Sequence, residues 1–189
     1  AEPLYVRSLA MHEQQLGTDH PNTALSLNNM GGLYKEMERY EEAERFLMRS
    51  LSIREQQLGV NHPDMAPSLN NLGGLYIEMG RYEEAELLLV QSLSICQQQL
   101  GADHPNTAVS WNNLAGLYHV MGRYPQAERL YLQALTIFLN RLGDNHPNTQ
   151  SVWSNFSDFL WDAISTGQDS KLSQHPATQG MLQQLREME

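Results

Sequence analysis

One six-residue segment recurs four times along the chain at a constant spacing. It begins at Leu16, Leu58, Leu100 and Leu142 and reads LGTDHP, LGVNHP, LGADHP and LGDNHP, so each copy starts 42 residues after the previous one. A fixed period of roughly 20 to 50 residues is typical of solenoids, in which each repeat buries its apolar face only against its neighbours. The sequence therefore predicts a row of similar units that offers a long binding surface.

Two apolar stripes with helical spacing lie between successive copies of this segment. In the first unit they predict one helix from about Pro21 to Met37 and a second from about Tyr40 to Leu58. The first stripe consists of Leu27, Met30, Leu33, Tyr34 and Met37, and the second of Tyr40, Ala43, Phe46, Leu47, Leu51 and Leu58. Each unit is thus predicted to be a hairpin of two helices.

The turns contain the residues that helix ends require. The glycine of each Leu-Gly pair can take a positive φ angle and end the second helix of a unit, and proline suits the first turn of the next helix. Side-chain capping of that next helix is expected from Asp19, Asn61, Asp103 and Asn145. The turn within each hairpin holds Glu38-Arg39, Gly80-Arg81 or Gly122-Arg123.

Small residues at equivalent places predict a close approach of the two helices in each hairpin. They are Gly31, Gly73 and Ala115 in the first helices and Ala43, Ala85 and Ala127 in the second helices. Glycine inside a helix costs about 1 kcal/mol relative to alanine. Two successive glycines, Gly31 and Gly32, therefore predict close packing at one position and open space at the other.

Composite motifs recur in register in three or four of the units. They are Asn-Leu-Gly-x-x-Tyr in the first helix, Gly-Arg-Tyr-x-x-Ala-Glu after the turn, and Leu or Ala near the end of the second helix. They resemble the tetratricopeptide repeat, whose usual unit has about 34 residues. The longer unit with its LGxDHP turn is similar to the repeat domain of kinesin light chains and their bacterial relatives. The resemblance covers residues 1–162 and implies an all-α fold, a right-handed α-solenoid of tetratricopeptide helix-turn-helix repeats.

The repeat pattern also predicts the domain organisation. Residues 1–164 are expected to form the array, with a partial first repeat, three full units and a final first-type helix that ends near Ala163. Residues 1–16 match residues 43–58, which indicates a piece of a longer array. Residues 165–189 are expected to form a polar loop and a capping helix with Met181, Leu182, Leu185 and Met188 on its apolar face. A disordered tail is the alternative for this last segment.

Paired asparagines recur in the first helices. The resemblance implies that the fifth and sixth residues of each unit, counted from Ala24, face a concave peptide-binding groove. These positions hold Asn28, Asn29, Asn70, Asn71, Asn112, Asn113, Ser154 and Asn155, and the ninth holds Gly32, Gly74 and Gly116. Amides about 10 Å apart can hold the backbone of an extended peptide, because each donates and accepts hydrogen bonds. The alternative is that they bond a neighbouring helix and orient the stack.

The remaining groove positions implied by the resemblance predict the charge of the partner. They include Lys35, Glu36, Ile77, Glu78, His119, Val120, Asp158, Trp161 and Asp162. With histidine neutral, one cation faces four carboxylates, so a neutral to basic extended protein or peptide segment is expected. Position two lacks the Lys and Arg with which chaperone-tail clamps of this fold hold a carboxylate, since it holds Leu25, Pro67, Val109 and Ser151. The cargo preference of kinesin light chains is not carried over, because their grooves are more basic.

The overall composition excludes several classes of partner. The chain has 12 basic and 22 acidic residues and a formal net charge of −10, so neither nucleic acid nor a membrane surface is expected to bind. No apolar run approaches the roughly 18 residues that span a bilayer, and the acidic start is not a signal peptide. A single cysteine, Cys96, excludes an internal disulfide, and a cytoplasmic location is expected.

No catalytic, metal-binding or cofactor-binding site is predicted. Equivalent histidines should lie about 10 Å apart, too far to share one zinc ion, so turn capping is expected for His20, His62, His104 and His146. Asp158 and Asp162 share a helix face without a neighbouring nucleophile or base. Solvated helix starts are expected for the acidic runs, such as Glu41, Glu42 and Glu44, with a loosely bound divalent cation as the alternative.

The sequence therefore predicts a non-catalytic protein-interaction scaffold or adaptor that is monomeric in isolation. The alternative from another class is a structural self-association module. That module would use the end of the stack near Tyr5 or a cluster of Trp153, Phe159 and Trp161.

Overall fold

Helical hairpins account for most of the chain, as the repeat pattern predicts. The computed structural model describes residues 2–187, so Met188, which was assigned to the last helix, lies outside the described residues. Residues 2–187 contain nine α-helices and one 3₁₀ helix and no strand. The chain forms two units, of which the first ends at Gly101 and the second begins at Ala102.

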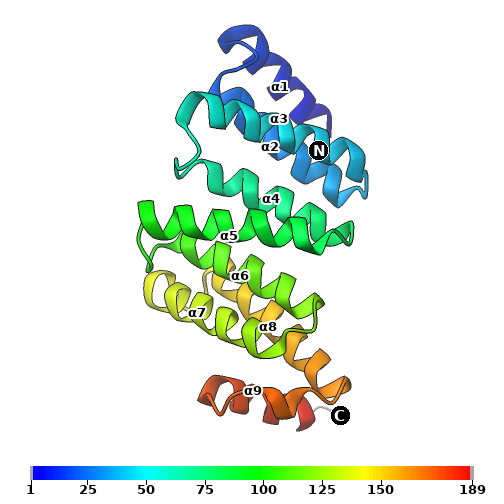
Figure 1. Cartoon of the computed structure of the whole chain (residues 1–189), viewed down its shortest axis with the longest axis vertical. Coiled ribbons are helices and arrows are strands. Elements are labelled where there is room, and N and C mark those ends of the chain that lie inside the picture. The colour runs from blue at the N-terminus through cyan, green and yellow to red at the C-terminus, as the bar shows by residue number, and fades with distance from the viewer. Residues whose placement is uncertain (1, 188–189) are drawn as a thin grey trace. The chain divides into compact units, whose positions relative to one another are not determined.

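The first unit contains one helix followed by two hairpins (Figure 1). Its elements are α1 (Glu2–Leu16), α2 (Pro21–Glu36), α3 (Tyr40–Leu58), α4 (Met65–Glu78) and α5 (Tyr82–Gln99). Each helix packs against the next along the chain, and α2 also packs against α4. The bounds of α2 and α3 agree within one residue with those predicted from the apolar stripes. Cys96 is fully buried in α5, consistent with a packing role.

The second unit contains one hairpin, a further helix and a C-terminal segment. Its elements are α6 (Pro105–Val120), α7 (Tyr124–Leu142), α8 (Pro147–Ser165), the 3₁₀ helix η1 (Asp169–Lys171) and α9 (Pro176–Glu187). Phe156 and Phe159 of α8 are fully buried, and both rings lie against Tyr131 of α7, with centroids 5.8 and 5.5 Å away. The final segment is thus helical over Pro176–Glu187, and α9 packs against α8.

The paired glycines separate a close contact from an open surface. A Cβ atom on Gly31 would lie 2.5 Å from Cγ of Leu47, which is fully buried, and 3.2 Å from the carbonyl oxygen of Ala43. A Cβ atom on Gly32 would meet nothing within 4 Å. This confirms the predicted contrast, and Gly73 repeats the close contact against Leu89 in the next hairpin.

Histidine, and not the preceding Asp or Asn, caps α2, α6 and α8. Nδ1 of His20 accepts a hydrogen bond from the backbone N–H of Asn22 at 3.1 Å. The same bond forms at His104 and His146, and also at His62. Capping by Asp19, Asn61, Asp103 and Asn145 was therefore a wrong prediction, whereas turn capping by the histidines is confirmed. The imidazole sits one residue before proline, where its Nδ1 reaches the N–H two residues on.

Helix α4 begins two residues later than the repeat pattern predicts. In α2, the hydroxyl of Thr23 donates a hydrogen bond of 2.7 Å to the carbonyl of Gly17 and holds the first turn. Thr23 is the fourth residue of a His-Pro-x-Thr motif. In the second repeat the equivalent residue is Met65, which has no hydroxyl and is buried. The N–H of Ala66 then bonds the carbonyl of Pro63, three residues back, and the first turn is not α-helical.

The turn within each hairpin requires a left-handed backbone conformation. Gly80 and Gly122 take φ angles of 72° and 69°, whereas the equivalent residue of the first hairpin, Glu38, takes a φ angle of 58°. Glu38 is the only residue other than glycine with a positive φ angle among those described. A side chain in this conformation costs free energy that glycine avoids.

Replacing Glu38 with glycine is therefore expected to raise the free energy of unfolding by roughly 0.5–1 kcal/mol, because relief of the left-handed strain exceeds the added entropy of the unfolded chain. Urea unfolding followed by circular dichroism measures the change. The matched control is Gly80→Ala, which places a side chain in the same conformation and should destabilise the chain. Equal stability of Glu38→Gly and the parent chain would contradict the prediction.

A glutamate of α1 and one of α3 each connect to the following hairpin of the first unit. Glu44 of α3 accepts hydrogen bonds from the hydroxyl of Tyr76 at 2.8 Å and from Arg81 at 2.7 Å. The guanidinium of Arg81 also lies over the Tyr76 ring, 3.8 Å from its centroid. Burial and the bond to Glu44 raise the pKa of Tyr76 to about 12. Glu2 of α1 occupies the same place and accepts a 2.8 Å hydrogen bond from the Tyr34 hydroxyl.

The prediction that Glu44 belongs to a solvated helix start was thus wrong, because its side chain is only 23 % exposed and accepts two hydrogen bonds. The pattern missed this role because Glu44 and Tyr76 lie 32 residues apart and meet only when successive hairpins stack.

At the end of the array, the equivalent glutamate meets a different set of donors. Leu160 and Ser165 stand where the earlier repeats have tyrosine and arginine. Glu128 of α7 is 3 % exposed, and its carboxylate accepts hydrogen bonds from the N–H of Ser173 at 2.8 Å and its hydroxyl at 2.6 Å. The hydroxyl of Thr178, at the start of α9, donates a third bond at 2.6 Å.

Candidate functional site

The predicted asparagines lie on α2 and α4 in the first unit and on α6 and α8 in the second. Their exposure separates them into two groups. Asn28 and Asn70 are buried, at 5 % and 8 % exposure, while Asn29 is exposed. Asn71, Asn112, Asn113 and Asn155 are half-buried.

Hydrogen bonds between asparagines link the first helices within each unit. The side-chain amide of Asn71 donates to the side-chain oxygen of Asn28 at 3.1 Å. The amide of Asn155 donates to the oxygen of Asn112 over the same distance, 43 residues apart in both cases. These four side chains therefore orient neighbouring helices, which is the structural role that the sequence left open.

Asn29 is exposed on α2. Its side chain makes no hydrogen bond to another of the described residues, and Gly32 lies one turn further along the same side of the helix. Because Gly32 has free space where a Cβ would be, a bound chain could approach the helix backbone here.

The charged side chains of the first unit also lie on these helices. The ammonium group of Lys35 on α2 lies 3.8 Å from the place of a Cβ atom on Gly74, so it reaches across the backbone of α4. Glu78, at the end of α4, is exposed, as is Glu36 at the end of α2. This face therefore presents one cation and two carboxylates next to backbone that carries no side chain at Gly74.

In the second unit, the structure brings His119 and Asp162 together. Nε2 of His119 lies 3.2 Å from Oδ2 of Asp162, and the hydroxyl of Tyr124 donates a 2.7 Å hydrogen bond to the same oxygen. The His119 ring meets Phe159 edge-on, with centroids 5.3 Å apart. Asp162 is thus occupied by intramolecular partners, whereas Asp158, one turn earlier on α8, is exposed.

The aromatic cluster proposed for self-association is largely internal. Phe159 is fully buried, and Trp153 is half-buried against Phe156. Only Trp161 is substantially exposed, at 46 %. The position in the helix explains this difference, because Phe159 lies on the side of α8 that packs against α7, and Trp161 lies away from it.

No group of three His, Cys, Asp or Glu side chains within residues 2–187 is placed to hold a metal ion. The equivalent histidines cap separate helices, so each imidazole already has a structural partner. In the same described part of the chain, none of the helices combines the length and apolar character needed to cross a bilayer.

The family model for the tetratricopeptide repeat matches residues 1–56, 28–98, 64–140 and 106–161. The chain therefore belongs to the tetratricopeptide repeat family, whose fold generally mediates protein–protein interactions and is generally non-catalytic. Its fold is an all-α solenoid of the kind found in kinesin light chain-like proteins.

Two solved structures illustrate this likeness. One is a Podosopora anserina protein described as a kinesin light chain with nearly identical TPR-like repeats, at 24% identity and a TM-score of 0.69 over 97% of this chain and 82% of that one. The other is BtubC (BKLC) from P. vanneervenii, at 22% identity and a TM-score of 0.74 over 99% of this chain and 71% of that one. A search of curated protein sequences found no match.

Proposed function

We propose that the chain is a non-catalytic scaffold that binds an extended segment of a partner protein along its first helices. The observation that carries this proposal is the exposed amide of Asn29 beside the open backbone at Gly32. An amide can pair with both N–H and C=O groups of a peptide, and an open glycine allows that peptide to come close. The single cysteine, Cys96, is free and fully buried, which suits a reducing compartment such as the cytoplasm.

The charges on the same helices favour a neutral to basic segment. Glu36 and Glu78 outnumber Lys35 in the first unit, and Asp158 adds an exposed carboxylate in the second. Acidic peptides would meet repulsion at each of these places. Nucleic acids and anionic membranes would meet the same repulsion over the whole chain, whose net charge is −10.

A peptide-array screen followed by fluorescence polarisation tests this function. A neutral or basic peptide selected by the parent chain should bind Asn29→Ala about 5-fold or more weakly, because an exposed amide contact is lost without a change in packing. Asn61→Ala, at an exposed position of the turn between α3 and α4, is the matched control and should retain binding. An Asn29→Ala variant with unchanged affinity for every selected peptide would overturn the proposal.

Charge neutralisation provides a separate check with the same peptides. Glu78→Gln and Asp158→Asn should weaken the binding of basic peptides by roughly 2- to 5-fold and make it less dependent on salt, since both carboxylates are exposed. These variants leave the packing of the chain unchanged, whereas a change at Asp162 would remove its hydrogen bonds to His119 and Tyr124. Tighter binding of basic peptides by either variant would contradict the expected charge preference.

Self-association is the second candidate function, and α1 supports it. Leu4 is 73 % exposed, and Val6 and Met11 are close to half exposed. Exposed apolar side chains on one helix can pair with a second copy of the chain. Light scattering over a dilution series separates the two functions, because the peptide scaffold should keep the mass of a monomer at every concentration.

A further inference from the structure

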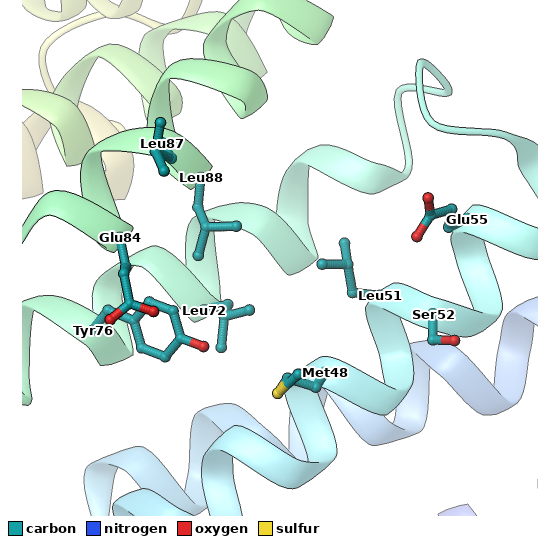
Figure 2. Close-up of a pocket in the computed structure, with 9 residues that line it drawn as sticks. All are labelled: Met48, Leu51, Ser52, Glu55, Leu72, Tyr76, Glu84, Leu87 and Leu88. Atoms are coloured by element: carbon teal, nitrogen blue, oxygen red, sulfur yellow. The ribbon is translucent and has the colours of Figure 1, made fainter. Parts of the chain in front are cut away.

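An apolar pocket lies on the second-helix side of the first unit, away from Asn29 and Gly32. It has a volume of about 420 Å³ and is bounded by α3 and α5, with Leu72 of α4 between them. In Figure 2, Met48 and Leu51 approach from α3 and Leu88 from α5, so that apolar side chains of three helices converge on one space. Pockets of this size commonly hold bound side chains or small ligands.

Leu87, which forms one wall of this pocket, stands at a position that is apolar only in the second repeat. Leu87 is 74 % exposed, yet the equivalent residues of the first and third repeats are Arg45 and Arg129. Arginine suits so exposed a position, whereas leucine leaves apolar surface in contact with water. Met48, at 52 % exposure, adds to the same surface. Leu87 and Met48 thus give this pocket an exposed apolar wall, and the first and third repeats have arginine where Leu87 stands.

Carboxylates lie at the two sides of the pocket, and no basic side chain lines it. Figure 2 shows Glu84 and Glu55 on opposite sides of the apolar residues. Arg81 binds Glu84 and Glu44 together, and it keeps the pKa of Glu84 below its ordinary value. The helices α4 and α5 contain four glutamates and neither lysine nor arginine.

The arginines of α3 are close to acidic groups of their own. Arg49 forms a 2.8 Å ion pair with Glu13, and Arg54 donates a hydrogen bond to the backbone carbonyl of Asp64. Arg45 lies near Glu42, whose pKa is lowered mainly by its hydrogen bond to Arg39 and to a smaller extent by Arg45. The residues that line the pocket include two carboxylates, Glu55 and Glu84, and neither lysine nor arginine. Glu84 is paired with Arg81 but remains 54 % exposed, so an apolar ligand with flanking cations would match the lining.

The backbone around the pocket restricts the form that such a ligand can take. The pocket walls are α-helices, whose interior N–H and C=O groups already bond within the helix. An extended segment would find few backbone partners here, and its own polar groups would lose water without compensation. A helix satisfies its own backbone, so an amphipathic helix fits this surface better.

We propose that this pocket binds an amphipathic helix of a partner protein. Two or three apolar side chains of that helix enter the space between Met48, Leu72 and Leu88, and Lys or Arg residues at its two ends face Glu55 and Glu84. None of the residues that line the pocket belongs to α2, so the site is distinct from Asn29 and Gly32.

A designed 16-residue alanine-based helix with three leucines on one face and lysines near both ends serves as the probe. Its binding to the full chain is measured by fluorescence polarisation. Leu87→Gln should weaken binding about 10-fold, which corresponds to the loss of a well-buried apolar contact. Leu4→Gln is the matched control, because Leu4 has the same exposure, 73 %, but lies on α1 outside the pocket.

Two altered probes separate this site from general attraction between opposite charges. Replacing the three leucines with alanine keeps the charge, and replacing the lysines with glutamate keeps the apolar face; each should bind about 10-fold more weakly. Equal losses in Leu87→Gln and Leu4→Gln, or undetectable binding of the leucine-lysine probe, would overturn the proposal. Sedimentation that shows a dimer of the parent chain and a monomer of Leu87→Gln would assign the pocket to a second copy and would also overturn it.

Discussion

Replacing Glu128 with glutamine is expected to lower the free energy of unfolding by about 2–3 kcal/mol and to release the C-terminal segment from the second unit. The buried carboxylate accepts hydrogen bonds from Ser173 and Thr178 at three donor atoms. A glutamine amide places a donor where one of these donors now points, and a lost bond to a charged group in the interior costs roughly 1.5–3 kcal/mol. Urea unfolding and hydrogen exchange of residues 172–187 measure the two effects.

Glu44→Gln is the matched control, because Glu44 stands at the equivalent place on α3. Its side chain is 23 % exposed, so the same exchange should cost about 1 kcal/mol or less and leave α9 protected. Unchanged amide protection of α9 in Glu128→Gln would contradict the expected result.

From these contacts we infer that the segment after α8, described as far as residue 187, forms the cap of the array. Helix α9 starts with the same His-Pro-x-Thr motif as α2, and Nδ1 of His175 accepts a 3.2 Å hydrogen bond from the N–H of Ala177. Ser173 and Thr178 supply the donors that a tyrosine and an arginine supply in the first unit. The segment thus satisfies the last glutamate of the array without a further hairpin.

Gly31→Ala is expected to destabilise the chain by up to about 2 kcal/mol, whereas Gly32→Ala should leave it as stable or raise its stability by up to about 1 kcal/mol. The added Cβ on Gly31 would overlap Leu47, which is fully buried and has little room to move. Overpacking of a core costs roughly 1–3 kcal/mol, and the higher helix propensity of alanine offsets about 1 kcal/mol of it. Gly32 has open space, so only the propensity gain applies there.

Thermal and urea unfolding of the two variants side by side measure this contrast. Each serves as the control for the other, since the positions are adjacent and the chemical change is identical. Equal effects of the two substitutions would show that the hairpin is not packed through Gly31.

The sequence was sufficient to predict the fold because the repeat supplies its own internal comparison. Tyr40 and Leu58 bound α3 as expected, since the apolar stripe begins and ends at these residues. The late start of α4 was missed, because the role of the Thr23 hydroxyl became visible only through its bond to Gly17. The histidine caps were recognised as turn residues, but their place one residue after the expected caps depended on backbone geometry.

The candidate site was less accessible from sequence. The spacing placed Asn28 and Asn29 on one helix and favoured the second asparagine of each pair for groove contact, but only the stacking of hairpins shows that Asn28 bonds Asn71 while Asn29 stays exposed. The pocket beside Leu87 could not be predicted from sequence because its walls come from three helices, whereas the apolar pattern describes one helix at a time. Sequence differences between repeats at such exposed positions were the available signal.

The most direct test of the proposed function is an NMR titration that follows the backbone amides and the asparagine side-chain amides of the ¹⁵N-labelled chain as an array-selected peptide is added. We expect saturable shifts of the Asn29 amide with the affinity measured by polarisation, and smaller shifts of the buried Asn28 amide. Saturable shifts confined to residues around Met48 and Leu87, with the Asn29 amide unchanged, would contradict binding along the first helices.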